Sequence, residues 1–235
     1  MTGKLYLVAT PIGNLRDITL RAIAVLKEAD LILSEDTRTT AKLLNHYAIK
    51  KPLQAFHEHS SNRVIENLIQ RLRRGQIIAL VSEAGTPGLS DPGGKLVERA
   101  AAEGISSFPL PGPSALTCAI SAAGLPMNRF LFLGFLPKKG RQKLFSYLKT
   151  VPYPLVIYES PYRLSKTLEE IQIQLGNRPL VIGREMTKMF EEFIRGRVEE
   201  VRQIIAKKKT LKGEIVVIVG YESPKKNHPA SQENC

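Results

Sequence analysis

The stretch IIALVSEAGTPGLSDPGG, residues 77–94, carries the clearest structural signal in the chain. Its first six residues are mostly apolar, which predicts a buried strand over residues 77–82. Residues 81–94 then hold four glycines, two prolines and two acids. A connection between a strand and a helix needs only one or two such residues, so this loop has more of them than its geometry requires.

Part of this surplus has a structural explanation. Ser90 or Asp91 is suited to cap a helix and Pro92 to occupy its first turn, so SDPGG predicts a helix start. SEAGTP is harder to explain in that way. Gly85 allows backbone to approach a ligand closely, and Glu83 stands where an acid can meet a ribose hydroxyl or an ammonium group. Taken alone, this segment favours a ligand loop modestly over a tight turn.

Strands and helices alternate through the first half of the sequence. The predicted strands are residues 5–10, 31–35 and 77–82, and the predicted helices are residues 18–29, 40–48, 62–75 and 94–104. Such alternation predicts a mainly parallel sheet covered by helices. Sheets of this kind place their chemistry in the loops at the carboxyl ends of the strands.

The second half has more strands for each helix, which predicts a mixed sheet. The predicted strands are residues 129–136, 154–160, 178–185, 190–196 and 213–221, and the predicted helices are residues 141–149, 161–175 and 198–207. A proline-rich break near residues 109–113 marks the change. We therefore expect an α/β protein with two α/β domains, residues 1–113 and 114–221, followed by a disordered tail over 222–235.

Two other loops resemble the one after residue 82. VATPIGN places Pro11 and Gly13 after the first predicted strand, and PLPGPSA places Gly112 after another. Three stiff, glycine-bearing loops would converge on one edge of the sheet. None has the spacing of a dinucleotide fingerprint or of a phosphate-binding loop. The pattern favours a small ligand held mostly by backbone groups.

The charge is uneven along the chain. The net charge is +12, of which residues 1–115 carry +3 and residues 116–235 carry +9. A basic half is typical of a protein with a polyanionic partner, although a basic surface that serves solubility alone is about as common. No apolar run approaches the roughly 20 residues of a membrane span, and the first hydrophobic segment is too short for a signal peptide. With two cysteines and no disulfide framework, we expect a cytoplasmic protein.

Nine motifs follow one another in the order and spacing of a known family. They are VATPIGNLRDITLRA, SEDTRTT, ALVSEAGTPGLSDPG, PLPGPSA, SAAGLP, FLGFLP, YESPYR, REMTK and KGEIVVIV. Over about residues 4–220 the chain resembles the small-subunit ribosomal RNA methyltransferases of type I, in the tetrapyrrole methylase superfamily. The resemblance implies two α/β domains, a homodimer, and S-adenosyl-L-methionine held in a cleft between the domains. It also implies methyl transfer to the ribose 2′-hydroxyl of a cytidine in the decoding region of 16S rRNA.

The resemblance also implies which residues bind the cofactor. They come from TPIGN, SEAGTP, PGPSA, YES and GE, and are Pro11, Gly13, Ser82, Glu83, Ala84, Gly85, Thr86, Pro87, Pro111, Gly112, Pro113, Ser114, Ala115, Tyr158, Glu159 and Glu214. One position departs from the family, which usually has Asp where this chain has Glu83. The longer side chain keeps the charge and moves it by about one C–C bond.

Methyl transfer needs few protein groups, because the sulfonium already supplies a good leaving group and alignment is the main task. A ribose hydroxyl is a weak nucleophile, so a base or a charged group would help it. The catalytic candidates are Asp36, Arg38, Arg184, Glu185 and Lys188. We expect Lys188 to assist the hydroxyl, and Arg38 or Arg184 to bind phosphate. An ordinary ion pair between Arg184 and Glu185 is an equally good interpretation of that pair.

RNA contacts are expected mainly on the second domain. The candidates are Lys138, Lys139, Arg141, Lys143 and Arg163, and a second basic run lies at residues 207–212. Each basic run alone is more often a solvated surface, but together with the +9 half they favour contacts with backbone phosphates. His57 and His59 have no further Cys or His partners in the sequence, so no metal site is expected.

Two alternatives remain open at this stage. One is a methyltransferase of the same fold that acts on a tetrapyrrole or another small substrate. The other is a non-catalytic nucleotide-binding module. The basic second half and the forms SEAGTP, YESPYR and REMTK favour the RNA-directed reaction.

Overall fold

The computed structural model describes residues 3–208 and 210–222, which form two compact units. The first unit takes its described residues from Met1–Ala122 and from Glu185–Glu191, and the second from Ala123–Arg184 and Glu192–Cys235. The domain boundary at residues 113/114 stays a prediction. Residues 223–235, almost all of the expected tail, lie outside the described residues.

Five parallel strands form the sheet of the first unit, in the order β3-β2-β4-β1-β5. The strands are β1 (Lys4–Val8), β2 (Leu31–Ser34), β3 (Leu53–Ala55), β4 (Ile77–Val81) and β5 (Ser107–Leu110). The helices are α1 (Leu20–Glu28), α2 (Thr37–His46), α3 (Asn62–Arg73), α4 (Gly94–Ala102) and α5 (Ala115–Ser121), with a short 3₁₀ helix at Leu15–Asp17. The predicted parallel sheet is confirmed. The sequence pattern does not predict β3, because three residues are too few to show a period.

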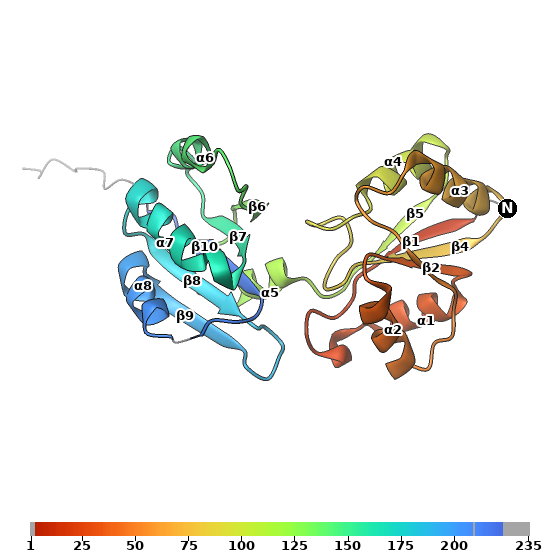
Figure 1. The fold of residues 1–235 in the computed structure, drawn as a ribbon, viewed down its shortest axis with the longest axis horizontal. Coiled ribbons are helices and arrows are strands. Elements are labelled where there is room, and N and C mark those ends of the chain that lie inside the picture. The colour runs from red at the N-terminus through yellow and green to blue at the C-terminus, as the bar shows by residue number, and fades with distance from the viewer. Residues whose placement is uncertain (1–2, 209, 223–235) are drawn as a thin grey trace, which may run out of the picture. The chain divides into compact units, whose positions relative to one another are not determined.

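Helices cover both faces of this sheet, α3 and α4 on one face and α1 and α2 on the other (Figure 1). Successive side chains of a strand point to opposite faces. Ile78 and Leu80 of β4 accordingly pack in the core under α3 and α4, whereas Ala79 and Val81 pack under α1 and α2. Burial on both faces explains why IIALV is apolar throughout rather than alternating.

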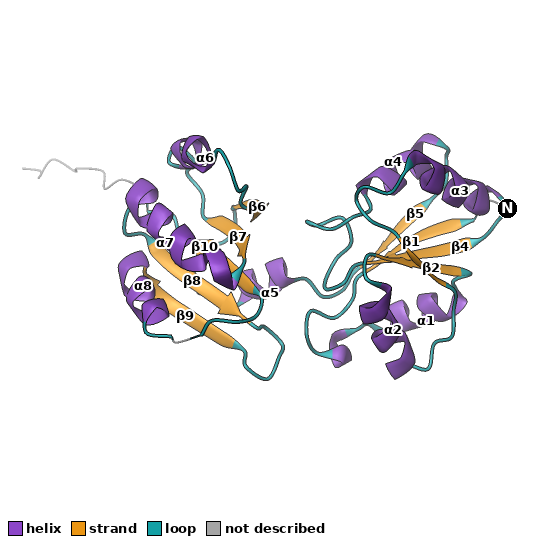
Figure 2. Ribbon diagram, in the orientation of Figure 1, coloured by secondary structure: helices purple, strands orange, loops and turns teal. Residues whose placement is uncertain are grey.

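The second unit contains a mixed sheet in the order β6-β7-β10-β8-β9, in which only β6 and β7 are parallel. The strands are β6 (Leu131–Phe135), β7 (Leu155–Glu159), β8 (Pro179–Arg184), β9 (Glu192–Arg197) and β10 (Ile215–Val219). The helices are α6 (Arg141–Leu148), α7 (Pro161–Leu175) and α8 (Val198–Ala206) (Figure 2). Their buried apolar side chains share one core with those of the sheet. The mixed sheet is confirmed.

Local signals explain the start and end of the longest helix, α7. Ser160 is its N-cap and accepts a hydrogen bond from the Tyr162 amide, while Pro161 occupies the first turn. Gly176 follows the last residue as the C-cap. Because YESPYR places a cap and a proline directly after β7, the chain turns into the helix at the carboxyl end of that strand.

The predicted cap of α4 is wrong. The helix begins at Gly94 with Gly93 as its N-cap, and no side chain caps it. Ser90 lies outside the helix with a φ of 63°, an uncommon conformation for a residue other than glycine. Asp91 is partly buried, beside other carboxylates. Residues 90–92 therefore continue the loop after β4, and the helix starts at the two glycines that follow them.

Candidate active site

Two of the three predicted loops are joined by backbone hydrogen bonds. Thr10, after β1, and Gly85, after β4, form an isolated antiparallel bridge, with N–H···O distances of 2.8 and 2.9 Å. The Thr10 hydroxyl also donates to the Ser82 carbonyl at 3.0 Å, and the Ser82 hydroxyl donates to the Gly85 carbonyl at 2.6 Å. Gly85 has a φ of +93°, which a residue with a side chain rarely adopts. The two loops thus have one fixed arrangement, and it requires glycine at position 85.

The third loop, after β5, packs against the other two. The Thr86 hydroxyl donates to the Pro113 carbonyl at 3.1 Å. A Cβ atom on Gly112 would lie only 2.8 Å from the Cβ of Ala9, so this backbone approaches the first loop closely. The predicted convergence of the three loops on the carboxyl edge of the sheet is therefore confirmed.

The surface of these loops is small and rich in backbone. Glu83, Ala84 and Gly112 are exposed, whereas Ser82 is buried. The Ser114 hydroxyl, directly before α5, is also buried, and it has no hydrogen-bond partner among the residues that the structure describes. A buried hydroxyl without a partner is costly, so it is available to a ligand. The edge therefore offers backbone groups, one unsatisfied hydroxyl and exposed carboxylate to a small polar molecule.

Three carboxylates belong to this part of the first unit. Burial raises the pKa of Asp91 to about 6, and the negative charges of Glu35 and Glu83 raise it further in the same direction. Glu35 follows β2 and Glu83 follows β4, so both stand at the carboxyl ends of their strands. The loop after β4 is thus more negative at pH 8 than at pH 5.

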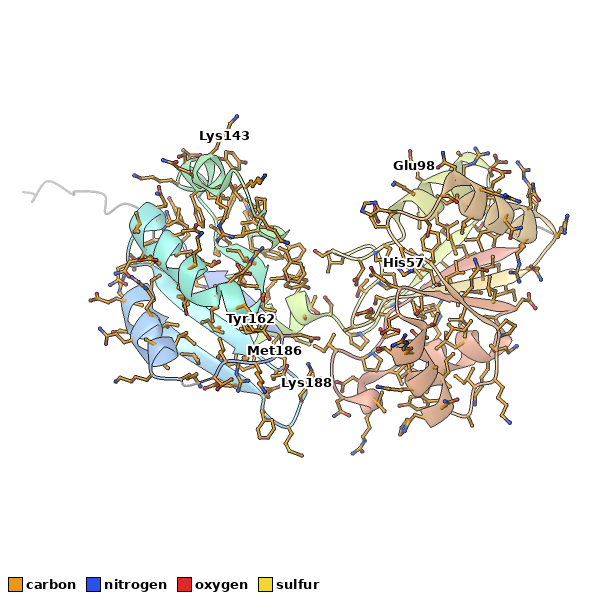
Figure 3. All side chains as sticks on the ribbon, viewed as in Figure 1. His57, Glu98, Lys143, Tyr162, Met186 and Lys188 are labelled. Atoms are coloured by element: carbon orange, nitrogen blue, oxygen red, sulfur yellow. The ribbon has the colours of Figure 1, made fainter. Side chains whose placement is uncertain are left out.

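The loop between β8 and β9, residues 185–191, belongs to the first unit and carries Lys188 (Figure 3). Glu185 and Thr187 have φ values of 50° and 65°. Such conformations cost about 1–3 kcal/mol each and are concentrated at functional sites. Hydrogen bonds hold the loop in place: the Asn14 amide donates to the Thr187 hydroxyl at 3.2 Å, and the Thr187 amide donates to the Glu191 carboxylate at 2.6 Å.

Lys188 lies against the first loop. A Cβ atom on Gly13 would be 2.4 Å from Cγ of Lys188 and 2.9 Å from Oγ1 of Thr187, so only glycine leaves room for this side chain. The Lys188 ammonium pairs with the Glu185 carboxylate at 2.9 Å. The structure therefore brings together two predicted catalytic residues, Lys188 and Glu185, and one predicted cofactor residue, Gly13.

Most of the chain matches one family model, which is described as Tetrapyrrole (Corrin/Porphyrin) Methylases and covers residues 4–202. The chain belongs to the tetrapyrrole methylase family. This methylase is 51% identical over 219 residues to a protein of Halalkalibacterium halodurans named "Ribosomal RNA small subunit methyltransferase I", covering 92% of this chain and 75% of that protein. It is 50% identical over 218 residues to the protein of the same name from Thermotoga maritima, covering 92% and 98%.

Solved structures support the same fold for the methylase. A uroporphyrin-III-C-methyltransferase from Thermus thermophilus aligns with a TM-score of 0.62 and 21% identity, covering 94% of this chain and 93% of that one. A diphthine synthase aligns with a TM-score of 0.72 and 14% identity, covering 93% and 90%. At such low identity the two alignments establish the shared fold only.

Two other predicted catalytic residues of the methylase lie at the start of α2. Asp36 is the N-cap of this helix, and its carboxylate accepts hydrogen bonds from the Arg38 amide at 2.8 Å and the Thr39 hydroxyl at 3.1 Å. The Arg38 amide lowers the pKa of Asp36, which makes it a weaker base. A capping role accounts for Asp36, while the side chain of Arg38 is exposed.

Arg184 contributes to a different cluster, in the second unit of the methylase. Its guanidinium donates to the Glu192 carboxylate at 3.1 Å and to the Lys212 carbonyl at 3.0 Å. Lys208 also pairs with Glu192, at 2.6 Å, and this hydrogen bond together with that of Arg184 lowers the pKa of Glu192. Through these contacts Arg184 joins β8 to β9 and to the segment before β10, which is a structural role.

Glu159, a predicted cofactor residue, is 2% exposed and is committed to the interior of the second unit. Its carboxylate accepts hydrogen bonds from the Ser160 amide at 2.8 Å, the Thr167 hydroxyl at 2.6 Å and the Arg163 guanidinium at 2.8 Å. Arg163 also donates to the Leu136 carbonyl at 2.9 Å. These contacts account for both Glu159 and Arg163 as structural residues at the carboxyl end of β7.

The remaining predicted RNA-binding and cofactor-binding residues of the second unit differ in how far they are exposed to solvent. Arg141 pairs with Glu170 and donates to the Thr167 hydroxyl at 2.8 Å, so it serves the interior. Lys138, Lys139 and Lys143 are exposed, and Lys143 points away from α6 (Figure 3). Tyr158 is partly buried on β7, and Glu214 is exposed just before β10.

Thr10, Thr187 and Glu191 fix the loops but are not among the predicted site residues. Thr10 and Thr187 lie within TPIGN and REMTK, and Glu191 lies in the predicted strand over residues 190–196, but the sequence gives no sign of their hydrogen-bond partners. His57 and His59 are both exposed, and no group of three His, Cys, Asp or Glu side chains within residues 3–208 and 210–222 is arranged to hold a metal ion. No described helix is both long and apolar enough to cross a membrane.

Proposed function

We propose that this protein transfers a methyl group from S-adenosyl-L-methionine to a ribose 2′-hydroxyl of a cytidine in the decoding region of 16S rRNA. The observation that carries the proposal is the convergence of the three loops with the Lys188–Glu185 pair beside them. The names of the relatives, at about half identity over most of the chain, support small-subunit ribosomal RNA as the substrate.

The loop edge fits S-adenosyl-L-methionine in its chemistry. The cofactor carries an amino-acid group, two ribose hydroxyls and an adenine edge, and it needs hydrogen-bonding partners with little side-chain bulk around them. Backbone groups of residues 10–13, 82–87 and 111–115, together with the unpartnered Ser114 hydroxyl, would hold it. Exposed Glu83 supplies a carboxylate that can accept hydrogen bonds from a ribose hydroxyl or an ammonium group. When bound, the cofactor supplies an electrophilic methyl group.

Lys188 and Glu185 would orient and deprotonate the ribose 2′-hydroxyl. In the transfer, a bond forms between the 2′-oxygen and the methyl carbon, the carbon–sulfur bond breaks, and the hydroxyl proton must leave. The Lys188 ammonium can donate a hydrogen bond to the 2′-oxygen and orient it, while the Glu185 carboxylate can accept the departing proton. Gly13 and Thr187 fix the position of this pair. Alignment of this kind can lower the barrier of such a reaction by ~7–11 kcal/mol.

The basic residues would bind the rest of the RNA. Lys138, Lys139 and Lys143 are exposed on one segment of the second unit, and phosphate contacts by such residues position the RNA without specifying its sequence. Arg38 at the start of α2 is a further candidate for phosphate. We also propose that the protein acts in the cytoplasm, where ribosomal subunits are found, and that it forms a homodimer.

The test is to map ribose methylation on small-subunit RNA after incubation with the protein and S-adenosyl-L-methionine. The expected product is one 2′-O-methylcytidine in the decoding region, with both intact subunits and naked RNA tested as substrates. Lys188→Ala should abolish most of the single-turnover rate and leave cofactor affinity unchanged. A methyl group on a base, or transfer to a tetrapyrrole but not to RNA, would contradict the proposal. Tight binding of NAD or ATP in place of S-adenosyl-L-methionine would contradict it as well.

A further inference from the structure

Strand β6 contains a β-bulge that changes the direction of one aromatic side chain. Leu131 pairs with Leu155 and Phe132 with Val156, but the register then shifts, so that Gly134 pairs with Ile157. Leu133 is the extra residue, and Gly134 has a φ of 57°. A bulge of this kind places two successive residues opposite one, and it often re-aims a side chain beside a functional site.

The bulge moves Phe135 out of the core. In a regular strand, Phe135 would point to the same face as Leu131, four residues earlier, which packs toward the core under the helices. Because of the extra residue, Phe135 instead pairs with Tyr158 and shares the opposite face with Phe132. Leu133, the extra residue, packs against the core.

The result is a cluster of three aromatic rings, which we call the aromatic platform: Phe132, Phe135 and Tyr158. The centroid of the Tyr158 ring is 4.9 Å from that of Phe132 and 5.7 Å from that of Phe135, both with the rings edge to face. Phe132 and Tyr158 are partly buried, but Phe135 is 59% exposed. The packed pair of rings beneath holds Phe135 in place while its own surface remains accessible.

Basic residues follow the platform directly. Lys138 and Lys139 lie three and four residues after Phe135, and both are exposed. Consecutive Cα atoms are ~3.8 Å apart, so the Cα atoms of Lys138 and Lys139 lie within about 11 and 15 Å of the Phe135 Cα. An exposed aromatic ring beside exposed lysines is the combination with which proteins bind single-stranded nucleic acid, with the ring stacking on a base and the cations meeting phosphates.

We propose that the aromatic platform stacks on an unpaired base of the RNA substrate, with Lys138 and Lys139 on the adjoining phosphates. The proposal rests on the proposed function and extends it, because it names a base-binding surface separate from the groups that meet the reacting ribose. Stacking is tolerant of sequence because every base has a π-face. The platform therefore holds the strand, and the position of the methyl group is decided elsewhere.

The sequence offers a direct probe, because it contains no tryptophan. Phe135→Trp makes a protein with a single tryptophan on the platform, and Tyr147→Trp makes a matched control on α6, where the replaced side chain is 60% exposed. Titration with an unpaired oligoribonucleotide from the decoding region should quench the fluorescence at position 135 saturably and leave that at position 147 nearly unchanged. S-adenosyl-L-methionine alone should cause little quenching at position 135. Full quenching by the cofactor alone would mean that its adenine occupies the platform, and would overturn the proposal.

Kinetics supply the second test. Phe135→Ala should raise KM for small subunits by ~5- to 150-fold, the equivalent of the ~1–3 kcal/mol that one stacked base contributes, with cofactor affinity unchanged. Phe135→Tyr should restore a KM close to that of the wild type, and Tyr147→Ala should have no effect. If Phe135→Ala methylates subunits with the wild-type KM, or if its main effect is to dissociate a dimer in sedimentation experiments, the proposal is wrong. If the wild type itself transfers no methyl group to RNA, it is the proposed function that fails.

Discussion

Replacing Gly13 with alanine tests whether Lys188 must lie against the first loop. The new Cβ would be 2.4 Å from Cγ of Lys188, whereas carbon atoms in contact lie about 3.5–4.0 Å apart. The stem of Lys188 must therefore move by roughly 1 Å or more. A displacement of ~1 Å at a catalytic centre can cost ~100-fold in rate, or about 2.7 kcal/mol of transition-state stabilisation.

The assay is single-turnover methyl transfer to small subunits at saturating S-adenosyl-L-methionine, so that weaker cofactor binding does not obscure the result. Gly13→Ala should be ~100-fold slower than the wild type. Gly94→Ala is the matched control, because a Cβ there meets no atom within 4 Å, and it should keep the wild-type rate. In the double variant Gly13→Ala/Lys188→Ala, the rate should equal that of Lys188→Ala alone, since both changes disable one group. A wild-type rate for Gly13→Ala, or additive losses in the double variant, would refute the reasoning.

Three further predictions concern acidic and basic side chains. Because the pKa of Asp91 is raised to about 6, the folded protein binds more protons than the unfolded chain between about pH 4 and pH 6, and its free energy of unfolding falls as the pH rises through this window. Asp91→Asn should therefore unfold in urea like the wild type at about pH 3, below the pKa of the carboxyl in the unfolded chain, and be ~1–2 kcal/mol more stable at pH 8, a value reduced by half because the side chain is partly exposed; parallel pH profiles would rule this out. Glu159→Ala removes the acceptor for three hydrogen bonds of buried donors, so it should lower the free energy of unfolding, measured by urea denaturation, by ~2–4 kcal/mol. A loss under ~1 kcal/mol would show that the carboxylate is dispensable. Lys138→Ala/Lys139→Ala should reduce the slope of log K for RNA binding against log salt by up to ~1.4, about 0.7 for each phosphate contact on a single strand, and an unchanged slope would place the RNA elsewhere.

The sequence predicted the parallel sheet and the convergence of the loops because both follow from local patterns. An apolar run such as IIALV, buried on two faces, differs clearly from the amphipathic helices around it. In a parallel sheet the carboxyl ends of neighbouring strands lie at one edge, so glycine-rich loops after β1, β4 and β5 had to meet there. No side-chain detail was needed for either conclusion.

Tertiary contacts decided the features that the sequence pattern could not predict. Asp91 suits a helix cap by residue type, but the loop carries it beside two other carboxylates and the helix begins three residues later. The sequence likewise gives no sign that the acid in YES, Glu159, accepts hydrogen bonds from Arg163 and Thr167.

The sequence pattern does not predict the bulge in β6 either. RFLFLGFL is apolar at almost every position, so its pattern has no period of two against which an extra residue could be noticed. Gly134 is the one local hint, since a glycine within a strand often marks a bulge. The pairing of Phe135 with Tyr158 became known only from the register of the two strands.

The measurement that tests the central claim most directly is a crystal structure of this protein with S-adenosyl-homocysteine bound. The account predicts that the ligand contacts the backbone of residues 10–13, 82–87 and 111–115, with the Ser114 hydroxyl hydrogen-bonded to it or to a water molecule that it orders. Ligand bound at another edge of either sheet, with these three loops uncovered, would contradict it.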